Sequence, residues 1–152
     1  MPLIVAEEYP ENFGPLTLTR ATFELRYGAL CPLERALQIT NDIVLQCRPE
    51  LADYLRAKYN LPVNTGASGD LFQGLPAYTP WEILAQSDVL ITADFENWSR
   101  THANYCVTGI MPGAHIVGDA SYIHVGEGAV VQPGCVLDVS NGPIIIDARA
   151  VI

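Results

Sequence analysis

Hydrophobic residues recur at every sixth position in the C-terminal third of the chain. Val125, Val131 and Leu137 are spaced in this way, with mostly small or turn-forming residues between them, and Val117 begins a similar segment upstream. This spacing is the hexapeptide signature of a parallel β-helix, in which short strands stack coil on coil around a column of aliphatic side chains. We therefore predict that residues 101–152 form the first coils of such a helix.

Residues 1–100 follow a different pattern, in which short apolar runs alternate with segments of helical spacing. Strands are predicted at Leu3–Ala6 and Asp42–Cys47, because both runs are dominated by aliphatic residues. Helices are predicted over residues 33–39 and 49–60, each with a proline at or next to its first position. The order strand, helix, strand, helix is typical of an α/β domain.

The segment that joins these two regions is predicted to be a loop followed by helices. Residues 64–74 are rich in Gly, Ser, Asn and Asp, which is typical of an exposed loop. Thr79 and Pro80 then mark a helix start, with an N-cap threonine before a first-turn proline, and a second helix is predicted over residues 89–98. We expect these helices to connect the α/β domain to the coils.

The composition favours a soluble, cytoplasmic protein. Hydrophobic residues make up 49% of the chain, but clusters such as Val89–Ile91 and Ile144–Ile146 are far shorter than the ~20 residues that a membrane span requires. The N-terminus lacks a basic leader and becomes acidic at Glu7 and Glu8, which argues against export. The four cysteines are scattered without a C-x-x-C pair, so we expect them to be reduced.

The net charge of −9 argues against a nucleic acid partner, because proteins that bind nucleic acid polymers gather lysine and arginine against the phosphates. A small anionic ligand needs only a few local cations, which an acidic protein can supply. Arg20, Arg26 and Arg35 lie within one short segment. This segment therefore has enough cations for a small anionic ligand such as a nucleotide or a sugar phosphate.

Several short motifs spread over nearly the whole chain resemble those of one protein family. The motifs are Leu16-Thr-Leu-Thr-Arg20, Phe23-Glu-Leu-Arg26-Tyr-Gly28, Pro80-Trp81-Glu82 with Asp94-Phe95, and Val136-Leu137-Asp138 followed by Asn141-Gly142-Pro143-Ile144. In this order they resemble the sugar nucleotidyltransferase-like proteins, a family related in organisation to N-acetylglucosamine-1-phosphate uridyltransferase. The resemblance implies a small nucleotidyltransferase-like α/β domain followed by a left-handed β-helix, and the left-handed sense comes from the resemblance alone.

The activity that this resemblance implies is sugar 1-phosphate nucleotidyl transfer. Such an enzyme converts a nucleoside triphosphate and a sugar 1-phosphate into a nucleoside diphosphate sugar and pyrophosphate, with the assistance of Mg²⁺. Thr19 and Arg20 lie where the triphosphate-binding segment would be, and Arg20 is the candidate catalytic residue, because a guanidinium offsets charge that develops during phosphoryl-type transfer. Arg26 is the second arginine expected to bind substrate.

The chain departs from the better characterised transferases after its first strand, where it lacks their glycine-rich phosphate loop. Glu7 and Glu8 stand there instead, and two carboxylates repel a triphosphate unless a magnesium ion lies between them. Both are therefore candidate magnesium ligands. In the alternative interpretation the domain is degenerate, and Arg20 and Arg26 only stabilise the fold by pairing with Glu7, Glu8 or Glu24.

Two further functions stay open. Hexapeptide β-helices often serve coenzyme A-dependent acyltransferases, whose general base is usually a histidine, and His102, His115 and His124 lie near or within the repeats. The visible repeats are too few to hold a complete site of that kind between subunits. The other possibility is a noncatalytic scaffold that binds a sugar nucleotide or mediates oligomerisation.

The repeats run to Ile152 without an element that caps the last coil. Because an uncapped coil exposes its apolar edge, we expect the chain to be a truncated form of a longer protein and the open end to attract another copy. Lateral packing of triangular coils favours a homo-oligomer, and a trimer is expected. The sequence specifies neither the nucleotide nor the sugar.

Overall fold

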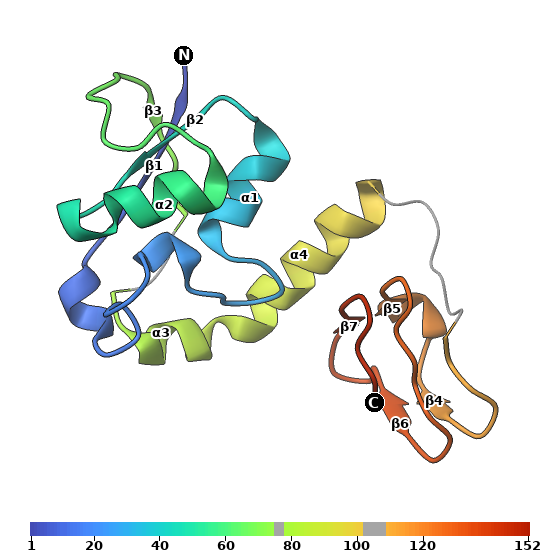
Figure 1. The fold of residues 1–152 in the computed structure, drawn as a ribbon. Helices are drawn as coiled ribbons and strands as arrows, with labels where there is room; N and C mark the ends of the chain where they lie inside the picture. Colours follow the sequence, from blue (N-terminus) through green and yellow to red (C-terminus); the bar gives the residue numbers. More distant parts are fainter. Residues whose placement is uncertain (75–77, 102–108) are drawn as a thin grey trace. The chain divides into compact units, whose positions relative to one another are not determined.

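A computed structural model of the chain describes residues 1–74, 78–101 and 109–152 (Figure 1). They form two compact units, Met1–Ser87 and Asp88–Ile152. The boundary predicted after residue 100 falls within the second of these units. Each unit has its own cluster of buried hydrophobic residues.

A three-stranded parallel sheet lies in the first unit (Figure 1). Its strands are β1 (Leu3–Ala6), β2 (Ile43–Gln46) and β3 (Asp70–Leu71), and β1 lies between the other two. β1 and β2 are paired over their whole length, with Val5 opposite Leu45. Both strands predicted from the apolar runs are therefore confirmed.

The third strand lies in the stretch predicted to be only a loop, residues 64–74. β3 pairs with the first two residues of β1. Gly69 precedes it, and a Cβ at this position would overlap the carbonyl oxygen of Pro2. The prediction was wrong here because so short a strand is determined by its neighbour and by one close backbone approach, which the local composition does not reveal.

Helices α1 (Pro32–Ile39) and α2 (Ala52–Tyr59) confirm the two helices predicted for this region. α1 begins at a proline, whose missing N–H is not needed in the first turn. The carboxylate of Glu34 accepts a hydrogen bond of 2.8 Å from the backbone N–H of Cys31, which closes the start of the helix. A 3₁₀ turn at Pro49–Leu51 leads into α2.

Side chains from one face of the sheet and from both helices form the core of the first unit. Because neighbouring side chains of a strand point to opposite faces, Val5, Ile43 and Leu45 share one face. The other buried members of this core are Ala21, Phe23, Cys31, Leu33, Ala36, Leu51, Ala52, Leu55 and Val63. The core therefore anchors both α2 and the long connection between β1 and α1.

Two further helices, α3 (Pro80–Ala85) and α4 (Ser87–Thr101), confirm those predicted after the loop. Thr79 caps α3, since its side chain accepts a hydrogen bond from the backbone N–H of Glu82. None of the described helices is long and apolar enough to cross a membrane.

Short parallel strands in the second unit stack in two successive coils (Figure 1). β4 (His115–Val117) pairs with β6 (Val136–Asp138), and β5 (Ile123–Val125) pairs with β7 (Ile144–Ile146). In each pair the partners lie 21 positions apart, and isolated bridges on a third side keep the same separation. One coil therefore takes 21 residues.

The interior contains the predicted aliphatic residues, but their spacing is not strictly six. Val125, Val131 and Leu137 are buried, and Val139 and Ile146 are the buried residues that follow, two and nine positions after Leu137. The additional residues lie in the turn between β6 and β7, and the turn between β4 and β5 has the same length. Val117, which the hexapeptide pattern suggested as a column residue, is 44% exposed. The left-handed sense of the coils stays a prediction.

Candidate functional site

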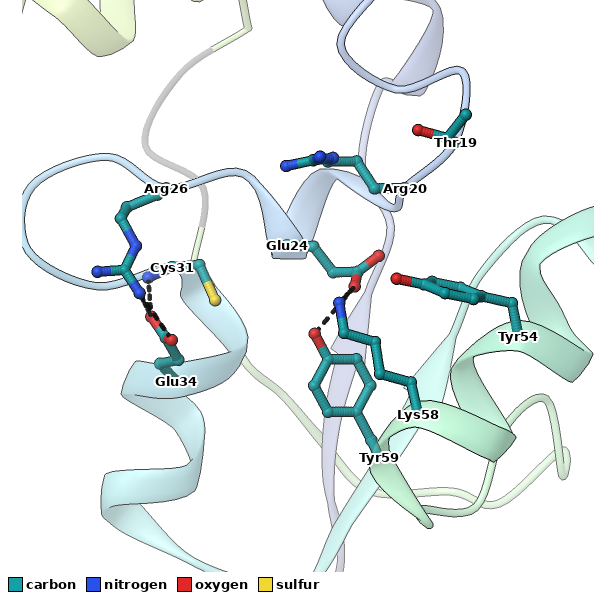
Figure 2. A pocket seen from close by; sticks show the side chains of 9 residues that line it. All are labelled: Thr19, Arg20, Glu24, Arg26, Cys31, Glu34, Tyr54, Lys58 and Tyr59. Atoms are coloured by element: carbon teal, nitrogen blue, oxygen red, sulfur yellow. Dashed lines mark hydrogen bonds and ion pairs between the residues drawn. The ribbon is translucent and has the colours of Figure 1, made fainter.

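A pocket of about 590 Å³ lies in the first unit, between α2 and the connection from β1 to α1 (Figure 2). Its lining residues are Thr19, Arg20, Glu24, Arg26, Cys31, Glu34, Tyr54, Lys58 and Tyr59. The fold thus brings together all three residues that the sequence predicts to bind substrate, Thr19, Arg20 and Arg26.

The Arg20 side chain is available for a ligand. It is exposed, and among the residues that the structure describes its guanidinium has no hydrogen-bond or ion-pair partner. In Figure 2 it extends over the space between the other lining side chains. An unpaired guanidinium keeps its whole fork of donors free for a phosphate or carboxylate. The predicted alternative, in which Arg20 is tied to a glutamate, is not what the described residues show.

Arg26 is held more firmly, on the side of the pocket formed by the start of α1. Its guanidinium donates to the carbonyl oxygen of Ala29 at 2.8 Å and to the carboxylate of Glu34 at 3.0 Å. The partner is therefore Glu34, and not one of the glutamates near the first strand. The side chains of Arg26 and Glu34 are 56% and 40% exposed, so this ion pair contributes little to stability, and it fixes the position of Arg26 at the pocket.

A buried carboxylate, Glu24, organises the opposite side of the pocket (Figure 2). Its side chain is only 3% exposed and accepts hydrogen bonds from the backbone N–H of Ala21 at 3.0 Å, the ammonium of Lys58 at 2.7 Å and the hydroxyl of Tyr59 at 2.9 Å. Three donors satisfy this buried charge, as burial requires. The Glu24 group is therefore a fixed part of the pocket wall.

The Lys58 ammonium also lies over the rings of Tyr54 and Tyr59, at 5.3 and 4.9 Å from their centroids. Its hydrogen bond to Glu24 raises the pKa of Lys58, so the ammonium stays charged at neutral pH. Burial raises the pKa of Tyr59 to about 12, so the hydroxyl stays protonated and can donate to Glu24. The Tyr54 ring remains partly exposed and presents an aromatic surface to the pocket.

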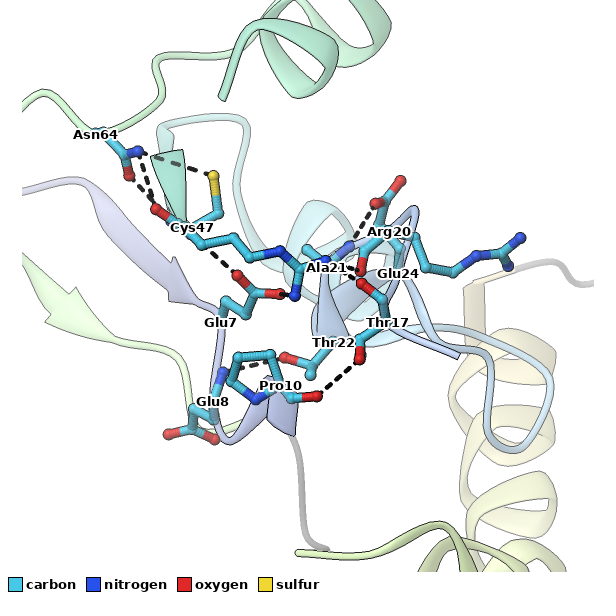
Figure 3. A network of polar contacts seen from close by, with 11 residues as sticks. Glu7, Glu8, Pro10, Thr17, Arg20, Ala21, Thr22, Glu24, Cys47 and Asn64 are labelled. Atoms are coloured by element: carbon cyan, nitrogen blue, oxygen red, sulfur yellow. Dashed lines mark hydrogen bonds and ion pairs between the residues drawn. The ribbon is translucent and has the colours of Figure 1, made fainter. Parts of the chain in front are cut away.

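A second network, at the carboxyl ends of β1 and β2, holds the segment that carries Arg20 (Figure 3). The carboxylate of Glu7 is 3% exposed and accepts hydrogen bonds from the backbone N–H of Arg48 at 3.0 Å and from its guanidinium at 3.2 Å. The same guanidinium donates to the carbonyl oxygens of Thr17 and Arg20. Arg48 thus fixes the backbone of the segment from Thr17 to Arg20, which leads into the pocket. In the sequence, the only indication of this role is that Arg48 follows a predicted strand.

Comparison with known proteins does not indicate a ligand for this pocket. No family model, curated protein or solved structure matches the chain. The charge of the pocket is therefore the main guide to its ligand. Three lining side chains are cationic, Arg20, Arg26 and Lys58, and two are carboxylates, Glu24 and Glu34. Since each carboxylate is paired with one cation, the charge left over is that of Arg20.

Glu7 and Glu8 do not converge on a common ion position. Both carboxylate oxygens of Glu7 are bonded to Arg48, and in Figure 3 the carboxylate of Glu8 points away from that of Glu7. Within the described ranges, no three His, Cys, Asp or Glu side chains are grouped so that they could hold a metal ion. In this arrangement the two residues do not fit a magnesium ion, which needs convergent oxygens, and the need for magnesium stays a prediction.

The candidate histidines of the acyltransferase alternative lie on the coils. His115 is exposed on β4, and His124 lies between two buried residues of β5, so it faces outward. His102 lies outside the described residues, as does Cys106. Of the other cysteines, Cys31, Cys47 and Cys135 are free thiols.

Sequence reasoning did not single out the lining residues that come from the two helices. Tyr54 and Lys58 are four positions apart on a predicted helix, and this spacing places them on one face. The sequence therefore predicts that Tyr54 and Lys58 share one face of the helix, but it does not predict that this face lines the same pocket as Arg20. Glu34 is likewise a helix-capping residue by its position, and only the fold brings it to Arg26.

Proposed function

We propose that the first unit is a sugar 1-phosphate nucleotidyltransferase whose pocket binds a phosphate-bearing substrate. The observation that carries the proposal is the guanidinium of Arg20, which has no partner among the described residues, in a pocket that also offers the hydroxyl of Thr19 and two tyrosine rings. Guanidinium groups bind phosphate through two parallel hydrogen bonds, and a neighbouring hydroxyl adds a third donor. The motifs around Arg20 and Arg26 support the same substrate class through their resemblance to sugar nucleotidyltransferase-like proteins.

In the proposed reaction an oxygen of the sugar 1-phosphate attacks the α-phosphorus of the nucleoside triphosphate. A P–O bond forms there, while the bond from the α-phosphorus to the oxygen that bridges to the β-phosphorus breaks. Pyrophosphate leaves with the electron pair of that bond. In this proposal the residues of the protein contribute mainly by positioning the phosphates and offsetting their charge, and we assign both roles to Arg20, which lines the pocket.

A pyrophosphate-release assay tests this function. It uses the chain with a panel of nucleoside triphosphates and sugar 1-phosphates, in buffer that contains magnesium. We expect release that requires both substrates and that falls by about 100-fold or more in Arg20→Ala, since removing one preorganised donor to a reacting oxygen costs that much.

Arg56→Ala is the matched control. Arg56 lies on α2 but is paired with Asp53 and does not line the pocket, so its loss should leave the rate unchanged. No turnover across the whole panel would overturn the proposal. Thiol release from acetyl-coenzyme A would instead support the acyltransferase alternative, and ligand binding without either reaction would support the scaffold.

A further inference from the structure

We propose that this pocket holds the sugar 1-phosphate, and not the nucleoside triphosphate. The phosphate lies on Arg20 and Thr19, and the sugar ring lies between Glu34 and the ring of Tyr54. This assignment rests on the proposed function and names which of its two substrates the pocket takes.

The charge of the lining side chains favours a single phosphate group. Arg26 and Lys58 are already paired with Glu34 and Glu24, so only the guanidinium of Arg20 is left to balance a ligand. A phosphate monoester carries about two negative charges at pH 7, which one arginine and a hydroxyl can hold at a partly exposed site. A triphosphate is more highly charged, and a single guanidinium balances less of its charge.

The remaining polar groups suit the hydroxyls of a sugar. The side chain of Glu34 is 40% exposed, and its two carboxylate oxygens together accept three hydrogen bonds, two from Arg26 and one from the backbone N–H of Cys31. A carboxylate offers about four lone-pair sites, so one is left for a ligand hydroxyl. A carboxylate acceptor attracts hydroxyl donors and repels phosphates, which places the sugar and not the phosphate on this side.

The aromatic side of the pocket provides a flat surface for the sugar ring. Tyr54 is 44% exposed and is held by the Lys58 ammonium, which lies over its ring. Sugar rings have apolar C–H faces that pack on aromatic side chains, and aromatic side chains commonly line ligand pockets. In Figure 2, Arg20 lies next to Glu24, with Glu34 on one side of the view and Tyr54 on the other, and all of them line the same pocket. We assign the phosphate to Arg20 and the sugar to Glu34 and Tyr54.

Isothermal titration calorimetry tests this assignment with glucose 1-phosphate, N-acetylglucosamine 1-phosphate, galactose 1-phosphate and mannose 1-phosphate, in the absence of magnesium. We expect at least one of them to bind, and the Kd to rise roughly tenfold or more in Arg20→Ala, the usual effect of losing a charge-assisted hydrogen bond. Tyr54→Ala should weaken the same sugar 1-phosphate while leaving the much weaker binding of inorganic phosphate unchanged. Glu34→Gln removes the charge that balances Arg26, so it should strengthen the binding of inorganic phosphate and reduce the preference for the sugar 1-phosphate over inorganic phosphate. Arg56→Ala should leave all affinities unchanged.

The competing ligand is UTP, with and without magnesium. If UTP displaces the sugar 1-phosphate from the wild type and loses affinity in Arg20→Ala and Tyr54→Ala, the pocket is the triphosphate site and the assignment is wrong, although nucleotidyl transfer could still occur. If none of the four sugar 1-phosphates binds, the assignment is also wrong. If a sugar 1-phosphate binds through Arg20 but no pyrophosphate is ever released, the assignment stands and the transferase activity fails.

Discussion

The two units of this chain are organised in different ways. In the second unit the same three-sided path repeats after 21 residues, so each buried residue meets its equivalent in the next coil. In the first unit, polar residues far apart along the chain converge, as Lys58 does on Glu24 and Arg48 does on Glu7. The coils follow from a pattern of neighbouring residues along the chain. The pocket depends on contacts between residues far apart in the sequence, which such a pattern does not specify.

If the units are independent in stability, damage to one core should leave the other intact. Leu45 is fully buried in the first unit, and Leu45→Ala should lower the free energy of unfolding of that unit by about 2–5 kcal/mol through the cavity it leaves. Hydrogen exchange followed by mass spectrometry should then show faster exchange in peptides from residues 1–74 and unchanged exchange in peptides from 109–152.

Leu84→Ala is the matched control, because Leu84 is 66% exposed on α3 and its loss should leave exchange unchanged. Equal acceleration in both units of Leu45→Ala would contradict the comparison, since it would show that the two units unfold together.

The second unit provides a similar pair within a single coil. Val131 is fully buried, and Val136 is 61% exposed. Val131→Ala removes two buried methyl groups and should lower the free energy of unfolding by about 2 kcal/mol, measured by urea denaturation, while Val136→Ala should change it by less than about 0.5 kcal/mol. Equal effects at both positions would mean that the interior column does not stabilise the coils.

A smaller effect is expected from the polar network of the pocket. Lys58→Met leaves the buried carboxylate of Glu24 without its cation, and we expect a loss of about 1–2 kcal/mol in the stability of the first unit, since the lysine itself is partly exposed. Arg56→Met on the same helix breaks an exposed ion pair with Asp53 and a hydrogen bond of 3.3 Å to the carbonyl oxygen of Val63, and it should cost less than Lys58→Met, at most about 1 kcal/mol. Urea denaturation that gives the two variants equal stability would show that the Glu24 network does not stabilise this unit.

The smallest effects concern pH, and they have opposite signs in the two units. Burial raises the pKa of Tyr59 to about 12 from 10.0, so the folded first unit favours the neutral hydroxyl. The resulting stabilisation is present below pH 10 and is lost as the pH rises towards 12. Tyr59→Phe should reduce this alkaline loss, as measured by urea denaturation with methyl NMR signals of each unit.

In the second unit, hydrogen bonds from Ser121 to Asp119 and from Ser140 to Asp138 lower the pKa of each carboxyl below its usual 3.8. Because the folded state favours the charged carboxylates, their contribution is present above about pH 4 and is lost as the pH falls further. Asp119→Asn and Asp138→Asn should therefore make the acid loss of stability less steep in this unit. An unchanged acid profile in both variants would show that the two turns do not contribute to it.

Most helices and strands could be predicted from local patterns, and the exceptions have physical reasons. The proline at the start of α1 and the aliphatic runs of β1 and β2 are signals within a few residues, and they placed these elements correctly. β3 was missed because a two-residue strand depends on pairing with β1. The spacing of the repeats was predicted as six. The longer turns, residues 118–122 and 139–143, were not recognised, because their composition is that of an ordinary turn and does not reveal their length.

For the candidate site, the sequence by itself identified Thr19, Arg20 and Arg26 as candidates for binding a phosphate, because the donor groups of a side chain belong to the residue, and the three residues line one pocket. Only the tertiary structure decided that Arg26 and Lys58 are paired and that Arg20 has no partner in the part of the chain that the structure describes. In the tertiary structure Glu7, which the sequence suggested as a metal ligand, accepts hydrogen bonds from Arg48, 41 positions away. Pairing of charges depends on which segments the core brings together, and that arrangement comes from packing over the whole unit and cannot be read from neighbours along the chain.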